Sequence, residues 1–184
     1  MEKELERTSI KIGVVGPEST GKSTITKILA QHYNCHYVPE YARYYCEHLE
    51  NEYTLQDEVN MYYGQIALED SILSIAENDL IICDTTFITI KIWSDHLFGH
   101  TPQIVLDELL RRRYDHYLLM DIDMPWEDDP LRDFPDKRSH FLEVWKEELT
   151  ALNASYDLIS GLGHDRTMAA LHSIDEYMRK NSTT

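Results

Sequence analysis

The chain has 184 residues, enough for one domain with a continuous core, and its apolar (42%) and charged (27%) fractions are typical of globular proteins. Acidic residues outnumber basic residues by 33 to 17, which gives a formal net charge of -16. This charge disfavours nucleic acid or an anionic membrane as the main partner, because either would repel the surface. The sequence leaves the oligomeric state open.

Cysteine usage and hydropathy indicate a reducing compartment. The cysteines Cys35, Cys46 and Cys83 are odd in number and lack C-x-x-C spacing, which argues against a disulfide framework or a thiolate zinc site. The first residues lack the apolar core of a signal peptide, and no apolar run approaches membrane-spanning length. We therefore expect a soluble, cytoplasmic protein.

The first predicted elements enclose a phosphate-binding loop. Ile10–Val15 predicts a buried strand, and residues 24–33 carry apolar side chains at helical spacing. The sequence between them fits G-x-x-x-x-G-K-[ST], in the strand–loop–helix context that this motif requires. The predicted ATP-binding residues are Gly16, Pro17, Glu18, Ser19, Thr20, Gly21, Lys22, Ser23 and Thr24.

The residue types of this loop suit a triphosphate and a metal ion. Gly16 and Gly21 allow a tight turn that brings backbone N–H groups, and the positive end of the next helix, close to phosphate oxygens. Lys22 can reach the β- and γ-phosphates, and Ser23 offers a hydroxyl to Mg²⁺, which takes few protein ligands. The sequence therefore predicts a site for ATP with Mg²⁺ as cofactor.

A mixed group of acidic, basic and aromatic residues follows the second predicted strand, His36–Val38. The carboxyl end of a strand is where ligands bind in open α/β sheets. We therefore expect a substrate site in this group, which consists of Glu40, Tyr41, Arg43 and Tyr44.

Residues 54–77 predict a long helix, and Leu80–Asp84 predicts a buried strand that ends in an acid. Gly64 inside the helix costs about 1 kcal/mol relative to Ala, so it is a candidate for a close helix contact. Asp84 fits the Walker B pattern, in which the carboxylate reaches the metal beside the phosphates. The alternative is that Asp84 only caps the next helix.

Residues 85–98 predict a helix that carries Trp93, and residues 103–113 predict another. We interpret His96 and His100 as surface or loop histidines, because no third ligand accompanies their zinc-compatible spacing. The basic triplet that ends the second helix, residues 111–113, is interpreted as a solvated face.

A polar segment with three prolines follows a predicted strand at 117–120. Residues 124–140 include Arg132 and Arg138 and cannot form one regular element. As a lid, this segment would close over the phosphates and supply guanidinium charge to the transferring group. The alternative is a surface loop with structural ion pairs.

The last predicted elements are a strand at 156–159 and a helix at 165–179, joined by a glycine-containing loop that suits the adenine base. Five strands alternating with helices predict a parallel sheet covered on both faces. We therefore expect one domain over residues 1–184 with the α/β three-layer P-loop NTPase fold: a five-stranded parallel sheet, helices on both faces and a lid insert at about 124–140.

Several motifs resemble, in the same order, the ribosylnicotinamide kinase domain of the NadR family. They are G-P-E-S-T-G-K-S-T at 16–24, E-Y-A-R-Y at 40–44, D-T-T at 84–86, W-S at 93–94 with F-G at 98–99, and D-M-P-W-E-D-D-P-L-R at 123–132. H-L-F-G-H at 96–100 has one residue too many for the H-x-G-H of the adenylyltransferase domain in longer members, so we expect a stand-alone kinase. A guanine-reading N-K-x-D is absent, and an AAA+-type motor usually needs a longer chain.

The resemblance implies ATP-dependent phosphorylation of the 5′-hydroxyl of nicotinamide riboside to give nicotinamide mononucleotide. Lys22 and the loop would hold the phosphates, Ser23 and Asp84 the metal, and Arg132 and Arg138 the developing charge. Either Glu40 or Asp84 would orient the acceptor hydroxyl as the base. The candidate catalytic residues are thus Lys22, Glu40, Asp84, Arg132 and Arg138.

Aromatic side chains are the natural partners of the flat, cationic nicotinamide ring. The candidate substrate-binding residues are Glu40, Tyr41, Arg43, Tyr44, Asp84, Trp93 and Trp126. Trp93 is equally well explained as a core residue. Another nucleoside or a nucleotide as acceptor, and a non-catalytic ATP-binding regulatory module, are the alternatives.

Overall fold

The computed structural model describes residues 9–77 and 79–181, in which five strands form one parallel sheet. The strand order is β2-β3-β1-β4-β5. Parallel neighbours require crossover connections, which the helices supply. The strands are β1 (Ile10–Val15), β2 (His36–Val38), β3 (Leu80–Asp84), β4 (His116–Met120) and β5 (Tyr156–Ile159).

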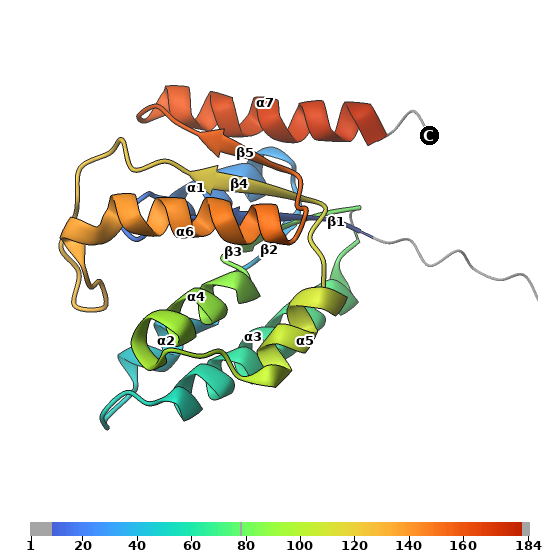
Figure 1. Ribbon diagram of the computed structural model, residues 1–184. Coiled ribbons are helices and arrows are strands. Elements are labelled where there is room, and N and C mark those ends of the chain that lie inside the picture. The colour runs from blue at the N-terminus through green and yellow to red at the C-terminus, as the bar shows by residue number, and fades with distance from the viewer. Residues whose placement is uncertain (1–8, 78, 182–184) are drawn as a thin grey trace, which may run out of the picture.

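Helices cover both faces of the sheet, as Figure 1 shows. On one face, α1 and α7 contact each other and enclose a core around Ile12, Leu29 and Ile174. On the other face, α3 to α6 enclose a larger core that includes Phe87 and Trp145. The helices are α1 (Lys22–His32), α2 (Tyr41–Glu47), α3 (Leu55–Ile75), α4 (Phe87–Phe98), α5 (Gln103–Arg111), α6 (Arg138–Ala151) and α7 (His164–Asn181), with a 3-10 turn, η1 (Pro135–Lys137), before α6.

The layers confirm the predicted three-layer α/β fold of P-loop proteins. The sheet register brings the motif-bearing strand ends together, since Val14 of β1 lies opposite Asp84 of β3 and Val15 lies opposite Leu119 of β4. The loop after β1, the acid at the end of β3 and the segment after β4 therefore meet at the carboxyl edge of the sheet. This is the edge where open α/β sheets bind ligands.

The long helix α3 begins and packs as its sequence predicts. Thr54 and Asp57 form a capping box, with the Thr54 N–H and hydroxyl donating to Asp57 Oδ2 at 2.7 and 2.6 Å. A Cβ atom at Gly64 would lie 2.0 Å from Cε1 of Tyr41, so the expected close contact at Gly64 is confirmed. The contact joins α3 to α2, a seven-residue helix that the sequence pattern did not indicate.

The interpretation of the basic triplet as a solvated face is wrong for one of its members. The Arg112 guanidinium donates to Glu108, Glu69 and Asp70 at 2.7, 3.2 and 2.7 Å. The Arg111 side chain is 70% exposed and fits the expectation. A buried Glu69 on α3, which helical spacing alone does not reveal, makes the difference.

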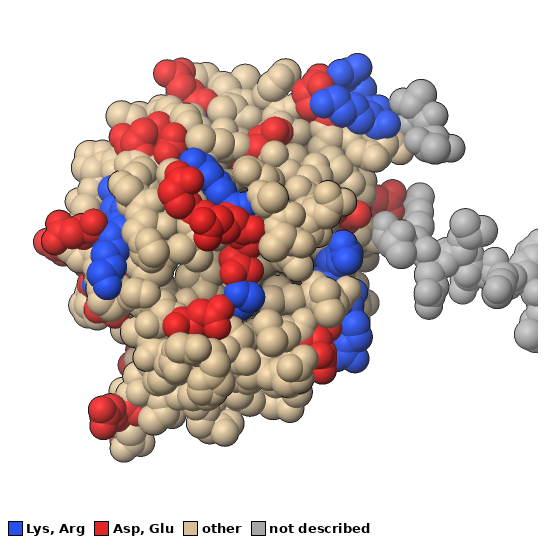
Figure 2. All heavy atoms as spheres, in the orientation of Figure 1, with Lys and Arg blue, Asp and Glu red and all other residues tan. Residues whose placement is uncertain are grey.

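The surface matches the composition, with acidic and basic side chains mixed over the face shown in Figure 2. In residues 9–77 and 79–181, no helix combines the length and apolar character needed to span a membrane. Within the same residues, no three His, Cys, Asp or Glu side chains gather as a metal-binding group. His96 is half-buried against Phe134 and Phe141, and His100 is exposed, as expected for a loop histidine.

Candidate active site

The phosphate-binding loop has the tight backbone that its glycines allow. Gly16 and Gly21 have positive φ values of 135° and 76°, and a Cβ at Gly16 would lie 2.8 Å from the carbonyl oxygen of Met120. The Lys22 ammonium folds back over the loop and donates to the carbonyl oxygens of Gly16 and Pro17 at 3.0 and 2.8 Å. The loop thus leads directly into α1, and its lysine is held against the loop backbone, where phosphates are expected to bind.

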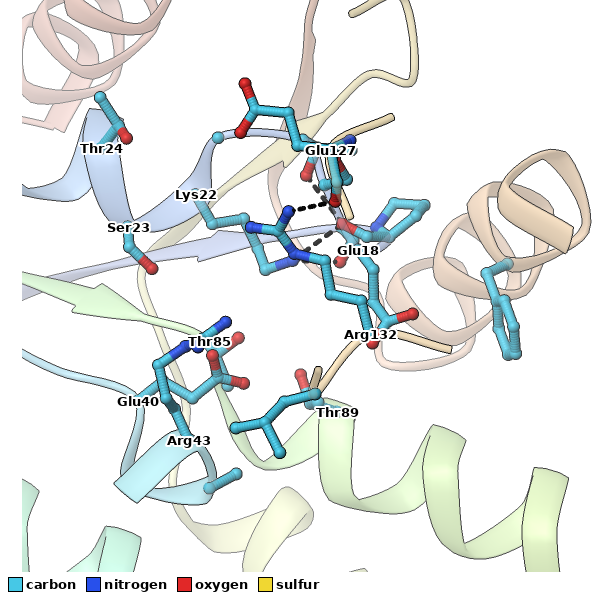
Figure 3. A pocket seen from close by; sticks show the side chains of 18 of the residues that line it. Glu18, Lys22, Ser23, Thr24, Glu40, Arg43, Thr85, Thr89, Glu127 and Arg132 are labelled. Atoms are coloured by element: carbon cyan, nitrogen blue, oxygen red, sulfur yellow. Dashed lines mark hydrogen bonds between the residues drawn. The ribbon is translucent and has the colours of Figure 1, made fainter. Parts of the chain in front are cut away.

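A cleft of about 1060 Å³ opens beside this loop. Its volume is at the upper end of the range of small-molecule sites. Figure 3 shows Lys22 and Arg132 facing Glu40, Arg43 and Thr89 across it. Beyond the loop (residues 16–25), the wall includes Glu40, Arg43, Cys46, Tyr53, Met61, Thr85, Thr89, Ile92, Trp93, Phe98, Glu127, Arg132, Phe141, Trp145, Gly163, His164, Arg166 and Thr167.

The cleft concentrates buried charge around Lys22. Burial lowers the pKa of Lys22, while the nearby Glu40 and Asp84 carboxylates act to raise it. Burial raises the pKa of Glu40, against the lowering effect of Lys22, and raises that of Asp84 as well. Burial also raises the pKa of Glu18 to about 7. Three carboxyl groups thus lie near Lys22, together with the guanidinium groups of Arg43 and Arg132.

Ser23 and Asp84 form a small polar group that suits Mg²⁺. The Ser23 hydroxyl lowers the pKa of Asp84 against the effect of burial. Asp84 is 4% exposed, and its Oδ1 has no hydrogen-bond partner among the described residues. A hydroxyl and an unpartnered carboxylate oxygen are hard ligands of the kind that Mg²⁺ takes, with water and phosphate oxygens completing its shell.

The predicted lid segment lies against the phosphate-binding loop. The Glu127 N–H donates to Ser19 Oγ at 2.8 Å, and the Asp133 N–H donates to Glu18 Oε2 at 3.0 Å. Arg138 donates to the carbonyl oxygens of Met124 and Ser19 at 2.9 and 3.0 Å. The segment is thus attached to the loop at three points.

The two predicted lid arginines have different positions. Arg132 lines the cleft near Lys22, with its guanidinium donating to the Glu127 carbonyl oxygen at 2.6 Å, and is drawn in Figure 3. Arg138 does not line the cleft, and its bonds hold the base of the segment to the loop. Arg43 of α2 pairs with Asp129 at 3.1 Å, which attaches the segment from the opposite wall.

The structure separates the predicted aromatic substrate residues. Trp93 lines the cleft and stacks on Phe134 with 6.0 Å between ring centroids, so it is both packed and accessible from the cleft. Tyr41, Tyr44 and Trp126 are not part of the wall. Tyr44 is 60% exposed, and the Trp126 Nε1–H donates to Asp128 at 2.8 Å. Their role in substrate binding stays a prediction that their positions do not favour.

Sequence reasoning missed the threonines of the wall. Thr85 and Thr89 line the cleft on α4 and just before it. Their position directly after a strand that ends in an acid was the available signal, since ligands bind at that edge of the sheet. The D-T-T motif at 84–86 includes Thr85, but the motif alone assigns this residue no role.

Sequence reasoning also missed Arg166, which is 5% exposed and joins three loops. Its guanidinium donates to the carbonyl oxygens of Gly161, Thr20 and Asp121 at 2.7, 3.1 and 3.1 Å and pairs with the Asp123 carboxylate. It thereby fixes the loop after β5 to the phosphate-binding loop. No sequence pattern indicates this role, because the hydrogen-bond acceptors of Arg166 are mainly backbone carbonyl groups from segments far apart in the chain.

Fold and loop together define a P-loop nucleotide-binding protein. Residues 11–166 match the family model AAA_28, described as an AAA domain, and the protein belongs to this family. The argument from chain length against an AAA+-type motor therefore does not exclude a relation to AAA domains. A search of curated proteins by sequence gave no match.

Solved structures show where this fold occurs. Two are of NadR protein, one in complex with NAD and AMP-PNP (24% identity, TM-score 0.71) and one in complex with NR (23%, 0.73). Each covers 92% of this chain, whereas this chain spans about half of theirs, 49% and 51%. A deoxyadenosine kinase from M. mycoides is 11% identical, with a TM-score of 0.61, and the match covers 91% of this chain and 100% of that one. The protein thus shares the fold of NadR and of a nucleoside kinase.

Proposed function

We propose that this protein is a kinase that transfers the γ-phosphoryl group of ATP to the 5′-hydroxyl of nicotinamide riboside, giving nicotinamide mononucleotide. The observation that carries the proposal is the lining of the cleft, which continues from the phosphate-binding loop to residues that a phosphate site alone does not require. These residues include Glu40, Thr89, Trp93 and Phe98. A protein that only bound ATP would not need a cleft of this size and lining.

The charged residues that line the cleft suit phosphoryl transfer. Lys22 and the loop N–H groups would hold the β- and γ-phosphates, and Arg132 would neutralise charge that develops during transfer. Glu40 would orient the acceptor hydroxyl, since it lines the cleft, whereas Asp84 lies beside Ser23. Mg²⁺, held through Ser23 and Asp84, would neutralise phosphate charge when bound.

The apolar end of the cleft supports a planar acceptor. Trp93, Phe98 and Phe141 line it, and an aromatic or cationic ring can pack against them. The fold shared with NadR protein, including a structure in complex with NR, supports the riboside in particular. The fold shared with a deoxyadenosine kinase supports another nucleoside as the second candidate acceptor.

ATP consumption by the purified protein with Mg²⁺ tests the proposal against a panel of nicotinamide riboside, other nucleosides, nucleoside monophosphates and no acceptor. We expect turnover with the riboside and a product one phosphate heavier by mass spectrometry. Turnover with a different nucleoside would replace the riboside by that acceptor. ATP binding without acceptor-dependent turnover would contradict the kinase and favour a regulatory ATP-binding module.

A variant pair tests the role of Glu40. Glu40→Gln keeps the size of the side chain and removes the carboxylate, so kcat should fall by about 10²–10⁴-fold. Glu47→Gln, on the exposed end of the same helix α2, is the matched control and should keep wild-type kcat. Near wild-type kcat in Glu40→Gln would contradict the assignment of Glu40.

A further inference from the structure

Two threonines of the cleft wall carry hydroxyl groups for which the described residues provide no hydrogen-bond partner. Oγ1 of Thr85 and Oγ1 of Thr89 are buried and form no hydrogen bond within the described part of the chain. Both residues line the cleft, and Figure 3 shows them on the wall opposite Lys22. An unpartnered buried hydroxyl destabilises a protein, so such a group at a cleft wall indicates a partner that comes from outside.

The backbone of Thr85 adds a second observation. Its φ value is 74°, a left-handed conformation that β-branched residues rarely adopt. A hydrogen bond of 2.9 Å from its N–H to the Val14 carbonyl oxygen holds it there. Strain of this kind persists where the surrounding structure enforces it, and it concentrates at ligand sites.

The order of residues from the end of β3 into α4 matches the order of groups in a nucleoside. Thr85 stands directly after Asp84 and before α4, near the metal and phosphate residues, and Thr89 lies in the first turn of the helix. Ile92 and Trp93 line the cleft one further turn along. The wall thus changes from polar to apolar with distance from the phosphates, as a nucleoside changes from its 5′-hydroxyl through the sugar diol to the base.

We propose that Thr85 and Thr89 bind the sugar hydroxyls of the acceptor and make this site selective for a ribonucleoside over its deoxy analogues. This inference rests on the proposed function and adds the residues that read the sugar. A threonine hydroxyl can both donate and accept, which suits a diol, and Glu40, on the same side of the cleft opposite Lys22, can accept from it. Threonine in a helix populates two χ1 rotamers, so the hydroxyl of Thr89, in α4, can turn toward the sugar without backbone movement.

The variants Thr85→Val and Thr89→Val test the proposal, because valine keeps the shape and removes only the hydroxyl. Replacing an unpartnered hydroxyl in this way should leave the melting temperature equal or higher. With the riboside, kcat/KM should fall by roughly tenfold for each variant, mainly through KM. With the 2′-deoxy or 3′-deoxy analogue that lacks the contacted hydroxyl, the same substitution should have no further effect.

Ser94→Ala is the matched control. Ser94 lies on the same helix, is fully buried and also has an unpartnered Oγ among the described residues, but it does not line the cleft. It should keep the wild-type preference for the riboside. Thr89→Ser, which retains the hydroxyl, should keep the preference as well.

The outcomes distinguish the proposed kinase activity from the proposed role of Thr85 and Thr89 in binding the sugar. Loss confined to the riboside in Thr89→Val supports the sugar-reading role, even if Thr85→Val does not fold. Equal loss with riboside and both deoxy analogues, or no loss at all, would overturn that role and leave the kinase standing. Absence of turnover in the wild-type protein with every nucleoside would overturn both proposals.

Discussion

Two groups of buried carboxylates in this protein have opposite surroundings. Glu69 on α3 is fully buried and accepts hydrogen bonds from Lys11 and Arg112 at 3.2 Å each and from the Tyr114 hydroxyl at 2.7 Å. Glu40 and Asp84 lie near the cations Lys22 and Arg43. The Lys22 ammonium, however, donates to backbone carbonyl oxygens, Arg43 pairs with Asp129, and Asp84 Oδ1 has no partner in the described residues. The first group is satisfied by direct bonds from the protein, whereas the cations near the second group are bonded elsewhere.

The difference separates a structural group from a functional one. A buried carboxylate needs partners, because desolvation of the charge is costly. Where the fold provides all the partners, as at Glu69, the group can only hold the structure together. Where carboxylates stay under-neutralised beside a phosphate-binding loop, metal and substrate hydroxyl groups can complete their partners.

Removing Lys22 should give the largest effect on catalysis. Lys22→Met would remove one of the cations beside Glu40 and Asp84 and the lysine contact to the phosphates, and kcat/KM for ATP should fall by about 10²–10³-fold. Steady-state kinetics measures the loss, and a thermal melt verifies folding. Lys146→Met is the control and should change neither, because this partly exposed lysine of α6 pairs with Glu143 and does not line the cleft. A Lys22 variant with unchanged kcat/KM would contradict the functional role of the second group.

Removing Arg112 should instead reduce stability and spare catalysis. Arg112→Met takes one charged partner from Glu69 and another from Glu108, so the free energy of unfolding should fall by about 3 kcal/mol. Urea denaturation measures the change. Arg111→Met is the matched control: its side chain is 70% exposed, and it should cost less than about 0.5 kcal/mol. A large loss of kcat in folded Arg112→Met would remove the distinction between the groups.

The pH dependence of the reaction should report the under-neutralised group. Burial raises the pKa of Glu40, so the carboxylate that orients the acceptor becomes protonated as pH falls through a value above 4.5. The acidic limb of kcat/KM for the acceptor should therefore lie above pH 4.5, with activity lost below it. Glu58→Gln is the control, because burial also raises the pKa of Glu58, to about 7. If the acidic limb of kcat/KM persists in this variant, Glu58 does not cause it. A limb at or below pH 4.5 would contradict the effect of burial on Glu40.

The sequence predicts the first half of the site well and the second half poorly, for physical reasons. Gly16, Gly21 and Lys22 act within one contiguous loop, so their spacing carries the information, and strand and helix periods locate the loop at the sheet edge. The fold class and the succession of strands and helices along the chain follow from the same hydrophobic periodicity. The close contact at Gly64 could be inferred because glycine in a helix is costly.

What the sequence could not supply depends on contacts between distant segments. Arg166 binds backbone carbonyl groups, which every residue has, so no pattern marks its partners. Arg112 looked solvated because its buried partner Glu69 lies 43 positions away. Tyr44 looked suited to the substrate site from its position after β2, but the turn into α2 leaves it 60% exposed.

Two adjacent acids in the first turn of α3, Asp57 and Glu58, show the same contrast between a carboxylate with partners and one without. Their substitution should give the smallest effect, a change in the pH dependence of stability. Asp57 is satisfied by Thr54 and by the Tyr45 hydroxyl at 2.6 Å, and its pKa is lowered. Glu58 is 1% exposed with Oε1 unpartnered in the described chain, and burial raises its pKa from 4.5 to about 7. The two acids should therefore affect stability with opposite dependence on pH.

Stability measured against pH tests this pair. The folded protein binds a proton at Glu58 between pH 4.5 and about 7 that the unfolded chain does not, so this contribution is present below pH 4.5 and is lost as pH rises through 7. Glu58→Gln should remove that decline, on the order of 2 kcal/mol between pH 5 and pH 8. Asp57→Asn should remove a contribution that is present above pH 3.8 and lost as pH falls below it. Urea midpoints at pH 3, 5 and 8 distinguish the two, and the same pH dependence in both variants would show that partners within the protein do not decide how a buried acid behaves.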